Sequence, residues 1–432
     1  MEARLGVRRG DSRSRGDEEA SVARLGVDQI DRRPVHGRGG GDPRRLYEAS
    51  LERLIRSPVD LMPAPQFHQR LASFLESPAA SLPASYEEGF EEHVQERFER
   101  YFKDLDALGG KAVAPDDWKD RLRASRNCAN ELVTVIRAWL TSRPDEAVQR
   151  FAEALKSVEY DLKTLVSDPV TDGKLGPIFR VRVGPLAAGF SRRDLFHIPF
   201  DKRDRVRTQR YSFPGLPCLY AGRSTYVCWE EMGRPDLAHI WVSRLVPARE
   251  IRVLDLAHRP QLVAAGLDEE LRSRGNGMPT RMAEAHAIVW PLLAACSVKR
   301  PRDAASGFAV EYVVPQLLLR WIMNPPEGWE RIDGLRYFST RVNHRDVGLH
   351  GTNYVFPAGS PDPDGVCRRL RRMFTLTEPE NWQVATSLVG EARSLKHQVE
   401  KLEISAGKSV EYHSTLFAKV ESYVWDLPHA AI

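Results

Sequence analysis

The sequence lacks the features that mark several large protein classes. It contains five cysteines in 432 residues and no CxxC pair, so neither a disulfide framework nor a thiolate zinc site is indicated. No run approaches the ~20 apolar residues that a membrane-spanning helix needs, and the N-terminus lacks the apolar core of a secretion signal. We therefore expect a cytoplasmic protein that binds neither a membrane nor a metal.

The balance of charges and the missing motifs exclude further classes. The 63 basic and 59 acidic residues give a formal net charge of +4, which is too small over this length to predict a nucleic-acid partner. No GxxxxGKS/T phosphate loop, no GxGxxG after a strand, no HExxH and no GxSxG occur. Nucleotide-triphosphate hydrolysis, Rossmann-type cofactor binding, zinc proteolysis and α/β-hydrolase chemistry therefore have no support from motifs.

Changes in composition divide the chain into four parts. Residues 1–45 hold 11 Arg, 8 Gly and 8 acidic residues with almost no large apolar side chains, so we expect a disordered tail. Residues 46–167 have helical periodicity and are predicted to form a helical bundle with a regulatory or partner-binding role. Residues 168–378 have the texture of a domain that mixes strands and helices. Residues 379–432 are predicted to be a helical extension packed on that domain.

The helices of the second part are predicted from apolar spacing. Ser85 and Glu88 fit a capping box, and an apolar stripe with spacings of three and four follows them. The stripe consists of Phe90, Val94, Phe98, Tyr101 and Leu105. Further helices are expected over about 116–140 and from residue 142 onward. Because such stripes bury against one another, we expect an antiparallel bundle with an aromatic core.

Short β-rich runs separated by glycine and proline follow residue 168. They predict strands at residues 178–183, 216–221, 239–245, 251–256, 308–314 and 334–339. Helices are expected at residues 268–274, 281–296, 315–323 and 382–402. Because these helices do not alternate regularly with the strands, the fold class is α+β and not a doubly wound parallel sheet.

Residues 209–231 have the pattern of a binding site. A turn at Pro214–Gly215 leads into a short apolar strand that contains Tyr220, and a helix then begins at Ser224. A strand-to-helix junction is a place where a phosphate group can bind. Arg180 and Arg210 could bind phosphate oxygens bidentately. The alternative is an internal Arg–Glu salt bridge that pins the helix to the sheet.

At these residues the chain resembles the RES-domain family, named for an Arg, a Glu and a Ser. The family pattern has an Arg in an early strand, then Arg-Trp-Asn, Gly, Pro and Leu-Tyr, and a helix with a Glu eleven positions after the Tyr. The matching residues here are Arg180, Arg210-Tyr211-Ser212, Gly215, Pro217, Leu219-Tyr220 and Glu231. Glu230 is the alternative to Glu231. The Pro-Ser of the family is replaced by Pro315-Gln316, and Ser339 is the other candidate for the Ser. The resemblance covers about residues 177–354 and implies that residues 168–378 form a RES-like catalytic domain.

The resemblance implies an ADP-ribosyltransferase-like fold, a mixed split β-sheet with flanking helices, and an enzyme that degrades NAD. The bond between nicotinamide and ribose would be cleaved by hydrolysis or phosphorolysis, so NAD is a substrate, phosphate is a possible co-substrate, and no cofactor is needed. The catalytic residues would be Glu231, Arg180 and Tyr220. The residues that bind the substrate would be Arg210, Tyr211, Ser212, Ser224, Gln316 and Ser339.

The resemblance also implies a biological role, because an enzyme that removes NAD is toxic to its own cell. It would be a bacterial toxin or an abortive-infection effector in anti-phage defence. An antitoxin, an immunity protein or a sensor protein could act through the helical region, and the chain could form a homo-oligomer. Two other functions stay open. One is ADP-ribosyl transfer to a macromolecule, and the other is a catalytically inactive binding or scaffold protein.

Overall fold

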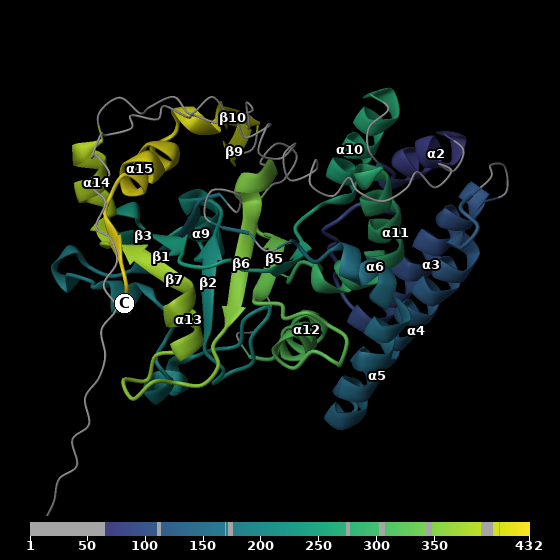
Figure 1. The fold of residues 1–432 in the computed structure, drawn as a ribbon, viewed down its shortest axis with the longest axis horizontal. Coiled ribbons are helices and arrows are strands. Elements are labelled where there is room, and N and C mark those ends of the chain that lie inside the picture. The colour runs from purple at the N-terminus through teal and green to yellow at the C-terminus, as the bar shows by residue number, and fades with distance from the viewer. Residues whose placement is uncertain are drawn as a thin grey trace, which may run out of the picture. The chain divides into compact units, whose positions relative to one another are not determined.

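The structure is a computed structural model, and its helices and strands are labelled in Figure 1. It describes residues 65–109, 114–168, 170–171, 176–273, 277–301, 307–342, 348–389, 401–405 and 407–432. All of these residues belong to one unit, residues 43–432. The tail predicted for residues 1–45 lies outside the described residues, as does the predicted bundle before residue 65.

The first described helices form where the sequence carries apolar stripes. They are α2 (Pro65–Leu75), α3 (Phe90–Gly109), α4 (Trp118–Leu140), α5 (Pro144–Ser157) and α6 (Glu159–Thr164). The predicted stripe of α3 is buried along its length. The helix begins at Phe90 and not directly after Ser85, because Gly89 takes a positive φ of 64° just before it. Helix α4 packs against both α3 and α5.

Nine of the described strands form one mixed sheet. They are β1 (Ile178–Val183), β2 (Cys218–Gly222), β3 (Ile240–Pro247), β4 (Val253–Leu256), β5 (Gly334–Phe338), β6 (Thr352–Pro357), β7 (Phe374–Thr377), β8 (Glu380–Asn381) and β11 (His429–Ala430). Their order is β11-β7-β3-β1-β2-β6-β5-β4, and β8 also pairs with β3. β4 and β5 are parallel and the other described pairs are antiparallel, so the predicted α+β class is confirmed.

Strands β1 and β2 separate at the centre of this sheet. β1 pairs with β3 at six positions but with β2 only at Phe179 and Gly222. β2 pairs with β6 at five positions, and β6 continues the sheet to β5. The side chains of β2, β5 and β6 are therefore aligned with one another, whereas those of β1 are aligned mainly with β3.

Helices cover both faces of the sheet. On one face lie α9 (Thr225–Glu231), α14 (Trp382–Leu388) and α15 (Leu416–Trp425), which share a core with β1 and β3. On the other face lie α8 (Arg192–Leu195) and α13 (Arg368–Met373). A third core joins β4 and β5 to α10 (Pro260–Ser273), α11 (Met278–Cys296), α12 (Val313–Met323) and the first helices of the chain.

Two predictions of secondary structure are wrong. Residues 308–314 form no strand, because a 3-10 helix at Val310–Tyr312 leads directly into α12. Their β-branched residues favour strands, but the segment packs against α11 and α4, and this packing decides its form. The helix predicted at 382–402 ends at Leu388, and Lys401–Ser405 form β9, which pairs with β10 (Lys408–Glu411).

Candidate functional site

Three neighbouring strands bring polar and aromatic side chains to one face of the sheet. Gly222 of β2 lies opposite Asn353 of β6, and Asn353 lies opposite Tyr337 of β5. Because side chains alternate along a strand, Tyr220 points to the same face, two residues before Gly222. Helix α9 follows β2 after a short connection, and its last residue, Glu231, contacts Asn353 on this face.

The carboxylate of Glu231 is held by two partners but stays accessible. Nδ2 of Asn353 donates a hydrogen bond to Oε1 at 2.9 Å, and Nε of Arg341 lies 3.5 Å from Oε2. The side chain of Glu231 is 33% exposed and that of Arg341 is 55% exposed. A carboxylate at the C-terminal end of a helix faces the negative end of the helix dipole, which is unfavourable. Such a departure from favourable placement is typical of functional sites.

Glu230, the alternative acidic residue, is occupied by a salt bridge. Its side chain is 5% exposed, and its two oxygens accept hydrogen bonds from Nε and Nη2 of Arg234, each at 2.9 Å. Glu230 thus pairs with Arg234, four residues further along the chain, and not with Arg180 or Arg210, so this pair does not connect the helix to the sheet as the alternative from the sequence had it. This pair anchors the end of α9 and leaves Glu231 as the accessible carboxylate of the two.

The turn before β2 is fixed by buried hydrogen bonds. The hydroxyl of Tyr220 donates to Oγ of Ser212 at 3.0 Å. From α12, Nε2 of Gln316 donates to the backbone oxygens of Gln209 and Ser212, at 2.9 and 3.1 Å, and to Oγ1 of Thr208 at 3.1 Å. Gln316 is buried. Its amide therefore supports the turn that carries Ser212 and, through Ser212, the phenol of Tyr220.

Three tyrosines, Tyr211, Tyr220 and Tyr337, lie together beside Glu231. The rings of Tyr211 and Tyr337 are 4.5 Å apart between centroids. Burial raises the pKa values of Tyr211, Tyr220 and Tyr337 well above the ordinary value of a phenol. The negative charge of Glu231 raises the pKa of Tyr337 further, because the two side chains are neighbours. At neutral pH the phenols are uncharged, and their hydroxyls can donate hydrogen bonds.

Arg210 lies next to Tyr211 and Tyr337, but its guanidinium already has hydrogen-bond partners. Nη1 donates to the carbonyl oxygens of Cys296 and Val298, at 3.1 and 3.0 Å, beyond the C-terminal end of α11. Nη2 donates to Oγ1 of Thr340 at 2.7 Å, and the guanidinium lies 5.1 Å from the ring centroid of Tyr312. Arg210 thus connects α11 to the segment that follows β5.

Arg180 lies on the opposite face of the sheet from Tyr220. Its neighbour Phe179 pairs with Gly222 and shares the face of Tyr220, so the side chain of Arg180 points to the other face. There its Nε donates to the carbonyl of Leu195 at 3.2 Å, and Nη1 donates to the carbonyl of Tyr220 at 2.9 Å. Burial lowers the pKa of Arg180 to about 10. The arginine therefore connects β1 and β2 where these strands separate.

Ser224 and Ser339, the other two candidate serines, have backbone partners. Ser224 is the N-cap of α9, where its hydroxyl accepts from the backbone N–H of Val227 at 3.0 Å and donates to the carbonyl of His350 at 2.7 Å. Ser339 follows β5, and its hydroxyl accepts from the backbone N–H of Arg341 at 3.1 Å. Both serines are fully buried. Ser339 fixes the start of the segment that brings Arg341 to Glu231.

Sequence reasoning missed three residues of this site, namely Asn353, Tyr337 and Arg341. Asn353 lies in β6, a strand that the sequence analysis did not predict. A single amide within the apolar segment of β6 indicates a buried hydrogen-bonding requirement, and this signal could have identified it. Tyr337 lay in a predicted strand without an assigned role. No signal in the sequence identifies Arg341, because its position follows from the path of the chain after β5.

Two features are absent from the part of the chain that the structure describes. Among these residues, no three His, Cys, Asp or Glu side chains come together in a way that could hold a metal ion. None of the helices in the described ranges combines the length and the apolar character needed to cross a membrane.

The chain is similar to a protein of Bacillus subtilis (strain 168) named Putative toxin YopC. The two sequences are 33% identical over 255 residues, which are 57% of this chain and 55% of YopC. The chain thus spans about half the length of the curated relative that it matches. No family model and no solved structure matches the chain.

Proposed function

We propose that this chain is a toxin that degrades NAD by cleaving the bond between nicotinamide and ribose, with a role in anti-phage defence. The similarity to YopC, a protein named as a toxin, supports the toxic role. The resemblance of residues 209–231 to the RES-domain pattern supports the chemistry. The observation that carries the proposal is the accessible carboxylate of Glu231, held by Asn353 beside the buried phenols of Tyr220 and Tyr337.

Cleavage of NAD makes limited demands on a protein. The leaving nicotinamide is cationic in NAD, so its departure needs no general acid. As the glycosidic bond lengthens, positive charge develops on the ribose, as in other glycoside cleavages. A fixed negative charge close to the ribose stabilises that transition state, and contacts to the remainder of the substrate orient it.

Glu231 fits the role of this negative charge. The hydrogen bond from Asn353 fixes one carboxylate oxygen, and among the described residues the second oxygen has the long contact with Arg341. In our proposal the second oxygen contacts a ribose hydroxyl and the developing cation. Preorganised groups of this kind cost no reorganisation at the moment of reaction.

The other residues would position the substrate. We place the nicotinamide ribose against the phenols of Tyr220 and Tyr337, and the pyrophosphate near Arg341, whose side chain is half exposed. Arg180 and Arg210, expected from the sequence to bind the phosphates, donate to backbone carbonyls instead. We therefore propose that these two arginines hold the walls of the site. Tyr211, Ser212, Gln316 and Ser339 support the same walls.

The acceptor of the ribosyl group would be water or inorganic phosphate. The products would be ADP-ribose in the first case and its phosphorylated form in the second. An antitoxin or a sensor protein would control the enzyme through the helices before β1. The packing of α11 and α12 against α4 gives this region a direct contact with the elements that hold the site.

Expression in a bacterial host tests the proposal with a matched pair of variants. Induction of the wild-type protein should lower the cellular NAD pool and stop growth. Glu231→Gln should leave NAD and growth unchanged, whereas Glu230→Gln, one residue away, should remain toxic if it accumulates to the same level. A wild-type protein that stops growth at a constant NAD level would refute the proposed chemistry.

A further inference from the structure

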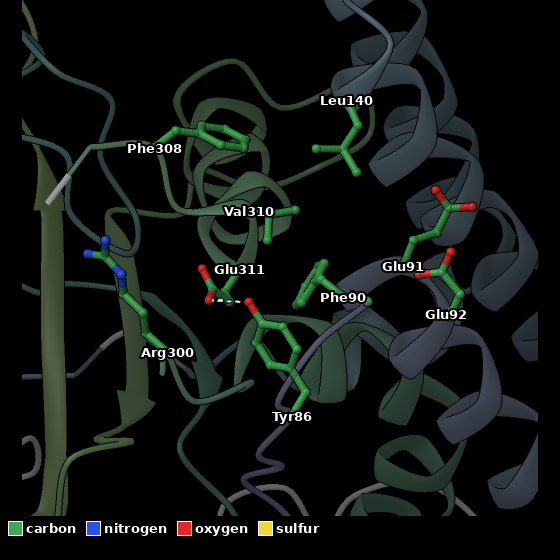
Figure 2. A pocket seen from close by; sticks show the side chains of 10 residues that line it. Tyr86, Phe90, Glu91, Glu92, Leu140, Arg300, Phe308, Val310 and Glu311 are labelled. Carbon is green, nitrogen blue, oxygen red and sulfur yellow. Dashed lines mark hydrogen bonds between the residues drawn. The ribbon is translucent and has the colours of Figure 1, made fainter. Parts of the chain in front are cut away.

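A cavity lies away from Glu231, between the first helices and the segment that leads into α12. Its volume is about 490 Å³, and Figure 2 shows the side chains that line it. The lining residues used here are Tyr86, Phe90, Leu140, Phe308, Glu311 and Arg300. They come from the start of α3 and the residues just before it, the end of α4, the segment after α11 and the residues that lead into α12. This volume lies within the range of sites for small organic molecules.

Glu311 is the unusual residue of this cavity. It is 3% exposed, and its Oε1 accepts a hydrogen bond from the hydroxyl of Tyr86 at 2.5 Å, which Figure 2 shows in the middle of the cavity. Within the described ranges, no Lys, Arg or His forms an ion pair with Glu311. A buried carboxylate is costly unless a cation or several hydrogen bonds compensate it. Among the described residues, Tyr86 is the hydrogen-bond partner of this carboxylate, so a cation in the cavity would stabilise it further.

Among the described residues, the other charged side chains of the lining form no ion pair with Glu311. Glu91 and Glu92 add two carboxylates to the wall, and Glu91 is paired with Arg137. Arg300 is a basic residue of the lining, and Figure 2 shows its guanidinium directed away from the carboxylate of Glu311. The lining therefore contains three carboxylates and one guanidinium, a balance that suits a positively charged occupant.

Apolar side chains complete the cavity. Phe90 is buried beside Tyr86, and the two rings are 5.3 Å apart between centroids. Phe308 is 64% exposed and Leu140 is 46% exposed, so two large apolar side chains at the rim face solvent. An aromatic face also attracts a cation directly. The cavity thus contains a buried carboxylate, that of Glu311, with apolar side chains around it.

We propose that this cavity binds a small organic cation, an ammonium or amidinium group on an apolar body. The cation hydrogen-bonds to the carboxylate of Glu311, and the apolar body lies between Phe90, Phe308 and Leu140. The proposal does not depend on the chemistry at Glu231, because the two sites share no residue.

A pair of probes of equal shape tests the proposal on the full-length protein. Benzamidine carries the cation, and benzamide is its neutral counterpart. We expect benzamidine to bind in the millimolar range by ligand-observed NMR, with benzamide about tenfold weaker or more, since a charge-assisted hydrogen bond contributes at least that much. Equal binding of the two probes would overturn the proposal.

Substitutions in the lining test whether benzamidine binds in this cavity. Glu311→Gln should weaken benzamidine binding about tenfold, whereas Glu96→Gln, which removes one charge from an exposed position on α3, should leave it unchanged. If Glu311→Gln fails to fold, Phe308→Ser at the exposed rim provides the second test and should weaken both probes. Unchanged binding in the folded Glu311→Gln variant, or in Phe308→Ser, would contradict the assignment.

Discussion

Asn353 donates a hydrogen bond to Glu231 over 2.9 Å and so connects the last residue of α9 to the middle strands of the sheet. The bond joins two residues that lie 122 positions apart in sequence. It sets the orientation of an accessible carboxylate that stands at the unfavourable end of its helix.

Removal of the Asn353 amide should impair the proposed reaction. Asn353→Ala frees the carboxylate of Glu231 to rotate, and we expect the rate of NAD cleavage to fall at least about tenfold. Asn381→Ala is the matched control, since Asn381 is a buried amide that bonds to the carbonyls of Ala238 and Ile240 outside the site. That control should lower thermal stability without a specific loss of kcat. Equal kcat values in the two variants would argue against a role of Asn353.

Substitution of Arg341 should affect substrate binding, whereas substitution of Arg180 should affect the stability of the fold. Arg341→Gln removes a half-exposed cation, so we expect a higher KM for NAD and an unchanged Tm, because exposed ion pairs contribute little. Arg180→Gln leaves the carbonyls of Leu195 and Tyr220 without a charged donor and should cost about 2 kcal/mol of unfolding free energy. Steady-state kinetics and thermal melts of both variants measure the contrast. The reverse pattern would show that Arg180 and not Arg341 meets the substrate.

The hydrogen bonds that the amide of Gln316 donates should be required for the stability of the fold. In Gln316→Glu, a carboxylate faces the oxygens of Thr208, Gln209 and Ser212, which all accept hydrogen bonds from the native amide. We expect a loss of about 2–3 kcal/mol in the free energy of unfolding. The same change at the exposed Gln383 should have little effect. Denaturant melts compare the two, and similar losses would mean that charge alone, and not the turn, explains the result.

The stability of the protein should depend on pH through Glu421. Burial raises the pKa of this carboxyl from its ordinary 4.5 to about 7, although the backbone N–H and the hydroxyl of Thr225 at the start of α9, and the hydroxyl of Tyr412, donate to it. A carboxyl with a higher pKa in the folded state takes up a proton on folding between these two pH values. The free energy of unfolding should therefore fall by up to about 3 kcal/mol as the pH rises from about 4.5 to about 7.

Glu421→Gln should remove this part of the pH dependence, because an amide does not titrate in this range. The exposed Glu411, which pairs with His413, gives the control variant Glu411→Gln, whose stability should follow the wild-type curve. Urea melts at pH 5, 6 and 7 measure the slope. A wild-type slope that persists in Glu421→Gln would assign the dependence to another group.

Much of the fold could be predicted because many segments carry patterns that tertiary structure did not override. The strand predicted at 178–183 coincides with β1, and the stripe at Phe90 through Leu105 is buried. β6 escaped prediction because both of its faces are covered, so its residues show no alternation. Residues 308–314 were assigned by their β-branched residues, but a segment buried among helices does not depend on that preference.

The candidate site could be predicted only in part. The interval from Tyr220 to Glu231 places both residues at the junction of β2 and α9, and the structure brings them to one face. The sequence could not tell Glu230 from Glu231, because only the position of Arg234 decides which carboxylate is occupied. It also could not place Arg180, since a shift of one position along a strand turns a side chain to the other face.

The measurement that tests the central claim most directly is product analysis with purified full-length protein and NAD, in buffer with and without inorganic phosphate. The wild-type protein should release nicotinamide together with free ADP-ribose or its phosphorylated form. Glu231→Gln should reduce the rate at least about a hundredfold, and Glu230→Gln should not. Intact NAD after prolonged incubation, ADP-ribose attached to a macromolecule, or equal rates in wild type and Glu231→Gln would contradict the account.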